Sequence, residues 1–233
     1  MVRQVGDILY EVKRRRRKTA DIVIERDGRV MLRVPKAIAE KDIKKLVETK
    51  QYWIYKNLAE WRDLNATHVL REYKNGEGFL YLGRSYRLQL TSNQKEPIAL
   101  EGRRFLLLRD LVDKGEIRAA KSAFKEFYIK HGMKRISQRV DYYAPKIGVF
   151  PKKVNVKDID FRWASCSPRG NLIFHWKCMM APLTIIDYIV VHELCHLRHL
   201  SHSMAFWNEV DKVMPDYADR KDWLKKNGAG MDL

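Results

Sequence analysis

The chain has 233 residues, of which 45% are hydrophobic and six are tryptophan, so it can bury a core and is not a disordered chain. Its 46 lysine and arginine residues against 29 aspartate and glutamate residues give a net charge of +17, which favours anionic partners without specifying a fold. No apolar run approaches the roughly 18 residues of a membrane span, so we expect no membrane partner.

The N-terminal half is predicted to be rich in strands. Asp27-Gly28 is a hairpin turn signal, and strand patterns flank it. The basic run Lys13 to Lys18 lies between two of these patterns, where it can contact phosphates or protect a solvated sheet edge. Apolar residues at helical spacing, with Trp61 near their end, predict one long helix over 40–63. The predicted strands before this helix cover residues 8–12, 19–25 and 30–34.

Two more hairpins are predicted before residue 112. One runs from Phe79 to Leu88 through Gly83, and the other covers residues 98–108 around Glu101-Gly102. We find no internal repeat in the sequence. The predicted organisation is a strand-rich N-terminal part, residues 1–112, followed by a catalytic part, residues 113–233.

The second part begins with a predicted helix over 116–143, which Pro145 to Pro151 is expected to break. A short strand is predicted at 153–157, and residues 161–167 and 171–179 are expected to pair across Pro168-Arg169-Gly170. Pro182 is acceptable at the first position of the central helix, and Gly228 is expected to close a last short helix.

The segment His192-Glu193-Leu194-Cys195-His196 predicts a metal site. Residues four apart share one face of a helix, so His192 and His196 can present two imidazoles to one ion. Glu193 lies beside this pair, where a carboxylate can hold a water and take its proton. The pattern therefore predicts one zinc ion, Zn²⁺, with Glu193 as the catalytic base.

A catalytic zinc usually takes three protein ligands, and His202 is the best third ligand. Six residues after His196 is out of phase with a helical turn, so the helix must end between His199 and Ser201. Metzincins have glycine at the position of His199, so the chain must turn back here without glycine. Ser201 or Ser203 is expected to cap the next helix. Its predicted apolar face consists of Phe206, Trp207, Val210, Val213 and Met214.

Two alternatives for the ligand set stay open. Glu209 can replace His202 as the third ligand if the next helix folds back differently, and His199 can be a ligand or can support one. The three cysteines are odd in number and form no metal-type pair, which is typical of reduced thiols, although a cysteine ligand or latency switch is the alternative. The N-terminus shows no secretory signal, so we expect a cytoplasmic protein.

Several motifs together carry a family resemblance. They are Arg162-Trp163-Ala164-Ser165-Cys166-Ser167, the strand from Asn171 to Trp176, and the segment from His192 to Trp207, with further similarity at 81–86 and 215–217. With these motifs the chain resembles the YgjP-like metallopeptidase family over most of its length. That family resembles minimal zincin proteases, and its ligand pattern looks like that of the SprT/Spartan-type proteases that act on DNA–protein crosslinks. Ala164 departs from the family, which usually has glycine there.

The resemblance implies an α+β, zincin-like fold, with a small antiparallel or mixed sheet packed on an active-site helix and a strand-rich N-terminal half before it. It implies that His192, His196 and His202 are the zinc ligands and that Glu193 is the catalytic base. Strand addition at a zincin sheet edge also makes the 171–179 strand a candidate rail for an extended peptide.

Three further residues are candidates to polarise the scissile carbonyl, to hold the oxyanion or to contact substrate. They are Arg162, His199 and Tyr217.

Three functional hypotheses follow. The first is zinc-dependent hydrolysis of a peptide or protein substrate. The second is metal-dependent hydrolysis of a nucleotide or another phosphate ester, against which the absence of a Gly-rich phosphate loop counts. The third is a nucleic-acid-binding protein with structural zinc, which needs a closed site of four ligands. A DNA-associated protease recruited through its basic surface is compatible with the first hypothesis. The oligomeric state is not predicted.

Overall fold

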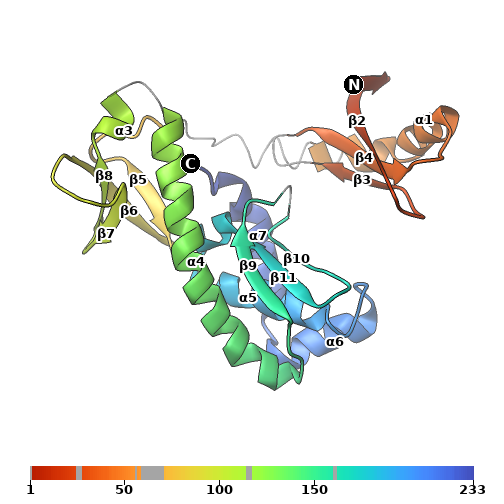
Figure 1. Ribbon diagram of the computed structural model, residues 1–233. Coiled ribbons are helices and arrows are strands. Elements are labelled where there is room, and N and C mark those ends of the chain that lie inside the picture. The colour runs from red at the N-terminus through yellow and green to blue at the C-terminus, as the bar shows by residue number, and fades with distance from the viewer. Residues whose placement is uncertain (1, 25–27, 56, 59–70, 114–116, 160–161) are drawn as a thin grey trace. The chain divides into compact units, whose positions relative to one another are not determined.

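The computed structural model describes residues 2–24, 28–55, 57–58, 71–113, 117–159 and 162–233 (Figure 1). Over these residues helices and small mixed sheets alternate, which confirms the predicted α+β class. The chain divides into two compact units, Met1–His68 and Val69–Leu233, and each is described by itself. None of the helices in the described ranges is both long and apolar enough to cross a membrane.

The first unit is a four-stranded sheet, here called sheet A, covered on one face by α1 (Glu40–Thr49). Its spatial order is β1-β2-β4-β3, with β2 and β4 parallel and both outer pairs antiparallel. Ile43 and Val47 of α1 are fully buried against Ile8, Leu32 and Val34 of the sheet. The strands are β1 (Val2–Val5), β2 (Ile8–Arg15), β3 (Asp21–Ile24) and β4 (Val30–Pro35).

The hairpin predicted around residues 27 and 28 is present as the antiparallel pair β3 and β4, and Gly28 has a φ of +82°. Asp27 itself lies outside the described residues. The long helix predicted over 40–63 is interrupted, because α1 ends at Thr49 and residues 51–55 form a further helical turn. Trp61 of that prediction also lies outside the described residues.

The second unit begins with another four-stranded sheet, here called sheet B, in the spatial order β5-β6-β8-β7. After β8 come the short helix α3 (Asp110–Asp113) and the 31-residue helix α4 (Ile117–Ile147). Phe124 of α4 stacks on Phe79 of the sheet with ring centroids 4.3 Å apart. The strands are β5 (Gly78–Tyr81), β6 (Arg84–Thr91), β7 (Ile98–Glu101) and β8 (Arg104–Leu108).

Sheets A and B have the same strand order and the same strand directions. Their first hairpins share a register, since Val5 pairs with Ile8 and Tyr81 pairs with Arg84, each across two intervening residues. The sequence shows no corresponding repeat, so the repetition lies in topology and not in residue identity.

Helix α4 continues through Pro145, so the prediction that this proline ends the helix is wrong. Pro145 lies in the last turn, where its missing N–H costs one hydrogen bond to the carbonyl of Asp141. Asp141 is exposed, so water can satisfy that carbonyl. The helix ends instead at Ile147, and the next residue, Gly148, has a φ of +71°.

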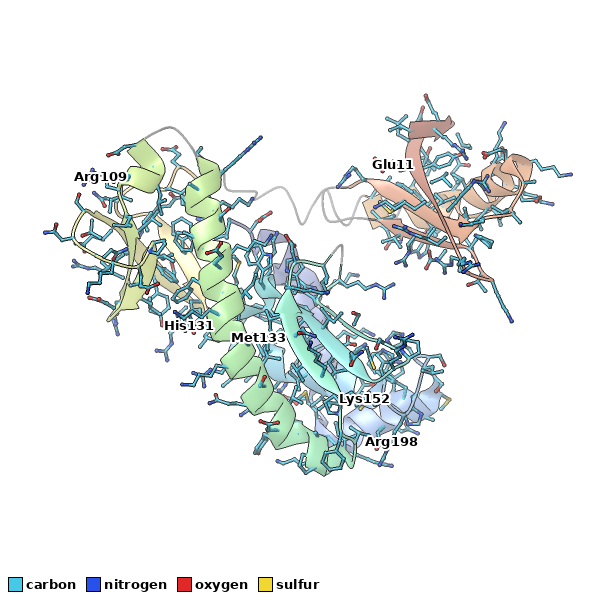
Figure 2. All side chains as sticks on the ribbon, in the orientation of Figure 1. Glu11, Arg109, His131, Met133, Lys152 and Arg198 are labelled. Atoms are coloured by element: carbon cyan, nitrogen blue, oxygen red, sulfur yellow. The ribbon has the colours of Figure 1, made fainter. Side chains whose placement is uncertain are left out.

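Helix α4 packs against sheet B along one part of its length and against a three-stranded sheet along another part (Figure 1). This sheet has the order β10-β11-β9, with β11 antiparallel to β10 and parallel to β9. The Sδ atom of Met133, labelled in Figure 2, lies 3.1 Å from the main-chain nitrogen of Val156 in β9. The strands are β9 (Lys153–Lys157), β10 (Ala164–Cys166) and β11 (Asn171–His175).

The strand predicted over 171–179 ends at His175 and is followed by the 3-10 helix η1 (Trp176–Met180). Nδ1 of His175 accepts the N–H of Lys177 at 3.0 Å, which closes the turn that stops the strand. The remaining elements are helices. They are α5 (Leu183–Cys195), α6 (Met204–Val213), α7 (Tyr217–Asn227) and the 3-10 turn η2 (Gly228–Gly230).

Sheet B is tied to the start of α5 through η1. In the β5–β6 turn, the N–H of Leu82 donates to Met179 O at 2.8 Å and that of Gly83 donates to Met180 O at 3.1 Å. Gly83 has a φ of +77°, and a Cβ there would lie 2.7 Å from Cγ of Pro182, the residue before α5. The division predicted near residue 112 therefore falls inside this unit, where sheet B, α4 and α5 share one hydrophobic core.

Candidate metal centre

Helix α5 is buried on nearly all sides, as the apolar run from Ile185 to Val191 requires. The one charged residue in that run, Asp187, is only 6% exposed. Arg139 of α4 donates to its carboxylate from Nε at 2.5 Å and from Nη2 at 2.9 Å, and the hydroxyl of Tyr143 donates at 3.2 Å. A buried carboxylate is tolerated only when it is paired in this way, so the cluster fixes α5 against α4.

Helix α5 ends at Cys195, four residues before the earliest predicted end, so that prediction is wrong. The N–H of Leu197 donates to Leu194 O at 3.0 Å and that of Arg198 donates to Cys195 O at 3.1 Å, so the last turn tightens to 3-10 spacing without a glycine. Ser203 then caps α6 by accepting the N–H of Phe206 at 3.4 Å, as one of the two predicted caps.

The guanidinium of Arg198, labelled in Figure 2, holds this turn in place. It donates to Gly148 O at 3.0 Å and to Glu209 at 2.8 Å. Glu209 also pairs with Lys212 at 3.3 Å, so its carboxylate serves ion pairs and is not part of the histidine cluster. The alternative in which Glu209 replaces His202 as third ligand is therefore wrong for this structure.

The turn brings His192, His196 and His202 together. Their Nε2 atoms lie 3.2 Å apart for His192 and His196, 3.2 Å for His196 and His202, and 3.0 Å for His192 and His202. Nδ1 of His196 donates to the carbonyl of His199 at 2.8 Å, which leaves its Nε2 with a free lone pair. In the part of the chain that the structure describes, this is the one group of three such side chains that can hold an ion.

The three nitrogens fit a tetrahedral metal ion. Ligands about 2.0–2.1 Å from zinc lie roughly 3.3 Å apart at tetrahedral angles, close to the distances found here. Without an ion, three ring nitrogens this close cannot all be satisfied by one another. Burial and the neighbouring imidazoles lower the pKa of His192 to about 3, so this ring is neutral and able to bind a metal. Burial also lowers the pKa of His202.

Glu193 lies beside this group and is only 6% exposed. Burial raises its pKa to about 8, although the charge of Arg162 and a hydrogen bond from the main chain of Cys166 act in the opposite direction. Its Oε2 atom is buried and has no hydrogen-bond partner among the described residues. A buried carboxylate oxygen left in this way normally faces a ligand or a water.

The imidazoles and Glu193 open onto a cleft of about 600 Å³. Residues 164–168, from β10 and the turn after it, form one wall, and Leu200 of the loop before His202 contributes to the rim. Arg162 also lines the cleft, as its predicted role in substrate contact requires. The edge strand beside the cleft is β10, because β11 lies between β10 and β9, so the predicted 171–179 rail is wrong.

Two of the predicted substrate contacts are not among the residues that line the cleft. His199 contributes its main-chain carbonyl to His196. Tyr217 stacks on Trp207 with ring centroids 5.2 Å apart, and Trp207 in turn stacks on His202 at 5.6 Å. Tyr217 therefore supports the third imidazole from behind.

Sequence reasoning missed Tyr188 and Cys166 as neighbours of the site, and Arg139 as the partner that anchors the histidine helix through Asp187. Tyr188 lies one turn before His192, with ring centroids 5.9 Å apart, and burial and the charge of Glu193 raise its pKa to about 12. Helical spacing alone places it on the face of the ligands. The main-chain contact of Cys166 and the ion pair of Arg139 join distant segments and leave no local signal.

A model of the YgjP-like family, described as a metallopeptidase domain, matches residues 18–227 of the chain. No curated protein matches the chain significantly. Among solved structures, the crystal structure of the metallopeptidase zymogen of Pyrococcus abyssi abylysin is 23% identical in sequence, with a TM-score of 0.36, and the match covers 38% of this chain and 90% of that chain. The matched range spans nearly the whole sequence and includes all three histidines and every residue that lines the cleft. The chain therefore belongs to the YgjP-like metallopeptidase family and is a metal-dependent peptidase.

Proposed function

We propose that the chain hydrolyses peptide bonds with one zinc ion held by His192, His196 and His202, and with Glu193 as general base. The observation that carries the proposal is the convergence of three Nε2 atoms beside a buried carboxylate oxygen with no other partner. A bound zinc ion would supply Lewis acidity, which makes water a stronger acid and a carbonyl a better electrophile.

Glu193 moves the protons in this proposal. Its Oε2 takes a proton from the attacking water and passes it to the nitrogen of the leaving amine. The hydrogen bond from the main chain of Cys166 orients the carboxylate. Arg162 lines the cleft, and in this proposal its guanidinium contacts a substrate carbonyl or carboxylate.

The register of β10 supports an extended peptide as substrate. Trp163 O accepts the N–H of His175 at 2.7 Å, and Ser167 N donates to Asn171 O at 2.9 Å, so these residues face β11. Alternate residues of an antiparallel strand point their main-chain groups to the other side. Ala164 thus offers its main-chain groups, and Cys166 its carbonyl, to the cleft, where a substrate strand can pair, while the N–H of Cys166 serves Glu193.

Metal analysis joined to activity tests this proposal. We expect one zinc ion per chain, and His202→Ala should lose it. Glu209→Gln is the matched control, because Glu209 was the alternative third ligand, and this variant should retain the ion. Glu193→Gln should keep the ion and lower peptide hydrolysis by roughly 10²–10⁴-fold, the usual contribution of a general base.

Chelation should leave a folded and inactive protein, whereas unfolding on chelation would indicate structural zinc. Nucleoside triphosphates assayed beside the peptide distinguish the phosphate-ester hypothesis. Full peptidase activity of Glu193→Gln with zinc bound would exclude Glu193 from the chemistry.

A further inference from the structure

The cations of the first unit gather at one end of sheet A. Strands β2 and β4 are parallel and both end there, while β3 begins there. Lys13 of β2 pairs with Arg33 of β4, and both side chains lie on the face of the sheet opposite to α1. On its other side, Arg33 pairs with Asp21 of β3. We call this group the cationic end of sheet A. Its members are Lys13, Arg15, Arg16, Arg17, Lys18 and Arg33.

One carboxylate neutralises part of this charge. Asp21 accepts two hydrogen bonds from Arg17, at 2.9 and 3.1 Å, and two from Arg33, at 2.9 and 2.7 Å. A single negative charge thus holds two guanidinium groups close together, with a net positive charge left over. Each of these side chains remains about a quarter exposed, so both can still reach an anion in solvent.

Three other members of the cationic end have no partner of their own. Arg15, Arg16 and Lys18 are exposed, and their side chains form no hydrogen bond or ion pair with any described residue. Arg14 differs from them, because it donates to the carbonyls of Lys36 and Ile38, each at 2.8 Å, and so supports the chain after β4. The run from Lys13 to Lys18 therefore contains both structural and unpaired cations.

Sheet B shows that the fold does not require these charges. Aligned through the shared register, Lys13 corresponds to Gln89, Arg33 to Leu106 and Asp21 to Ala99. The β2–β3 connection begins with three cations, whereas residues 92–97 of sheet B carry one lysine and one glutamate. The same topology is built with neutral residues at these positions, so the cationic end is a property of the first unit alone.

We propose that the cationic end of sheet A binds the phosphate backbone of nucleic acid. Four of its six cations are arginines, whose planar guanidinium groups bind phosphate oxygens in pairs. The exposed apolar side chains described in this unit lie elsewhere, on β1, the start of β2 and the helical turn 51–55. No wedge for a membrane and no aromatic platform for bases is therefore described at the cationic end, which favours sequence-independent contact with phosphates over vesicle insertion or base stacking.

The test measures binding of the full chain to a fluorescent 30-base-pair duplex of arbitrary sequence over a series of salt concentrations. Each phosphate contact contributes about −0.9 to the slope of log affinity against log salt. The variant Arg15→Ala/Arg16→Ala/Lys18→Ala should reduce that slope by about 2–3 and should weaken binding at low salt by roughly tenfold or more. A duplex of different sequence should bind equally.

The matched control removes the same charge from the other side of the unit. Lys44, Lys45 and Lys50 are exposed on α1 and at its end, beyond Glu40, whose carboxylate bonds to Arg14 of β2, so Lys44→Ala/Lys45→Ala/Lys50→Ala changes net charge by the same amount. We expect the control to bind within about twofold of the wild type, because few of its lost charges contact phosphate. Equal weakening by both variants would show diffuse attraction and would overturn the proposal.

Two further measurements keep the result interpretable. Arg15→Lys/Arg16→Lys retains the charge and should keep the salt slope, whatever the alanine variant does to folding. Polyglutamate and phosphatidylserine vesicles serve as competitors. If either one displaces the duplex at a lower concentration of charge than unlabelled DNA does, the assignment to nucleic acid is wrong.

Discussion

Sheets A and B share one topology but differ in the elements that they pack against. Sheet B is built into the catalytic unit, because its β5–β6 turn bonds to η1 and its aromatic face packs on α4. Sheet A closes its own small core with α1 and carries exposed cations at one end. The comparison shows that one strand order accommodates different residues on the turns and on the face of the sheet opposite to the core.

The largest expected effect comes from corresponding core positions in the two sheets. Leu32 and Phe105 are fully buried and occupy the same place in the shared register. Leu32→Ala should destabilise the first unit by about 2–5 kcal/mol and leave hydrolysis of a short peptide unchanged. Phe105→Ala should destabilise the second unit by about 3–5 kcal/mol, because Phe105 packs edge-on against Phe124 and Phe127 of α4.

Thermal unfolding, followed together with the temperature at which activity disappears, checks this pair. Only Phe105→Ala should lower the temperature of inactivation. A common shift in both variants would mean that the two units unfold as one and would contradict the comparison.

A smaller effect is expected at the turn that ties sheet B to the catalytic helix. Gly83→Ala places a methyl group against Pro182 and also forces alanine to a φ of +77°, so overpacking of about 1–3 kcal/mol adds to the backbone cost. Gly102→Ala is the matched control, since its φ is +55° but no atom lies within 4 Å of the added Cβ. It should cost about 1 kcal/mol.

The hydrolysis rate and the free energy of unfolding, measured for both glycine variants, separate the overlap with Pro182 from the cost of the backbone conformation. We expect Gly83→Ala to lower activity, because the shift passes through Pro182 to α5. Equal losses in the two variants would show that only backbone conformation matters at Gly83.

The smallest effect concerns the contribution of one carboxylate in each unit to folding stability at low pH. Burial alone would raise the pKa of Asp232, but Lys177, at 2.7 Å, and Lys121 hold it below its ordinary value. Burial acts in the same direction on Asp21, and Arg33 and Arg17 likewise hold its pKa low. A depressed pKa stabilises the folded state above the unfolded value of about 3.9, and this stability is lost as the pH falls through the folded pKa.

Both carboxylates are more than a third exposed, so each is expected to contribute less than about 1 kcal/mol. Asp232→Asn and Asp21→Asn should each destabilise their own unit at pH 6, and the difference from the wild type should narrow near pH 3. Unfolding monitored at both pH values checks this, and a gap that widened in acid would reverse the sign of the argument.

Most elements near strong local signals were predictable from the sequence. The hairpins around Gly28, Gly83 and Gly102 formed where turn residues separate apolar runs, and all three glycines have positive φ. The ligand set was also accessible, because His192, His196 and His202 lie within one short segment and need only one turn to meet. Their roles as ligands stay a prediction that metal analysis must test.

The errors arose where distant contacts override local pattern. Alternation continues past His175, yet the N–H of Lys177 bonds to that imidazole and the chain coils into η1 against α4. Pro145 was expected to stop α4, but its position near an exposed helix end makes it tolerable. The common topology of sheets A and B was invisible, because it is carried by strand pairing and not by repeated residues.

The continuity of the core across α4 has a practical consequence for making smaller versions of this enzyme. A fragment beginning at residue 113 would leave Phe124 and Phe127 facing water, since sheet B now covers them. It would also lose the main-chain bonds that fix η1 ahead of the histidine helix. A minimal catalyst should therefore be cut at the boundary before Val69, keeping sheet B as part of the enzyme's frame.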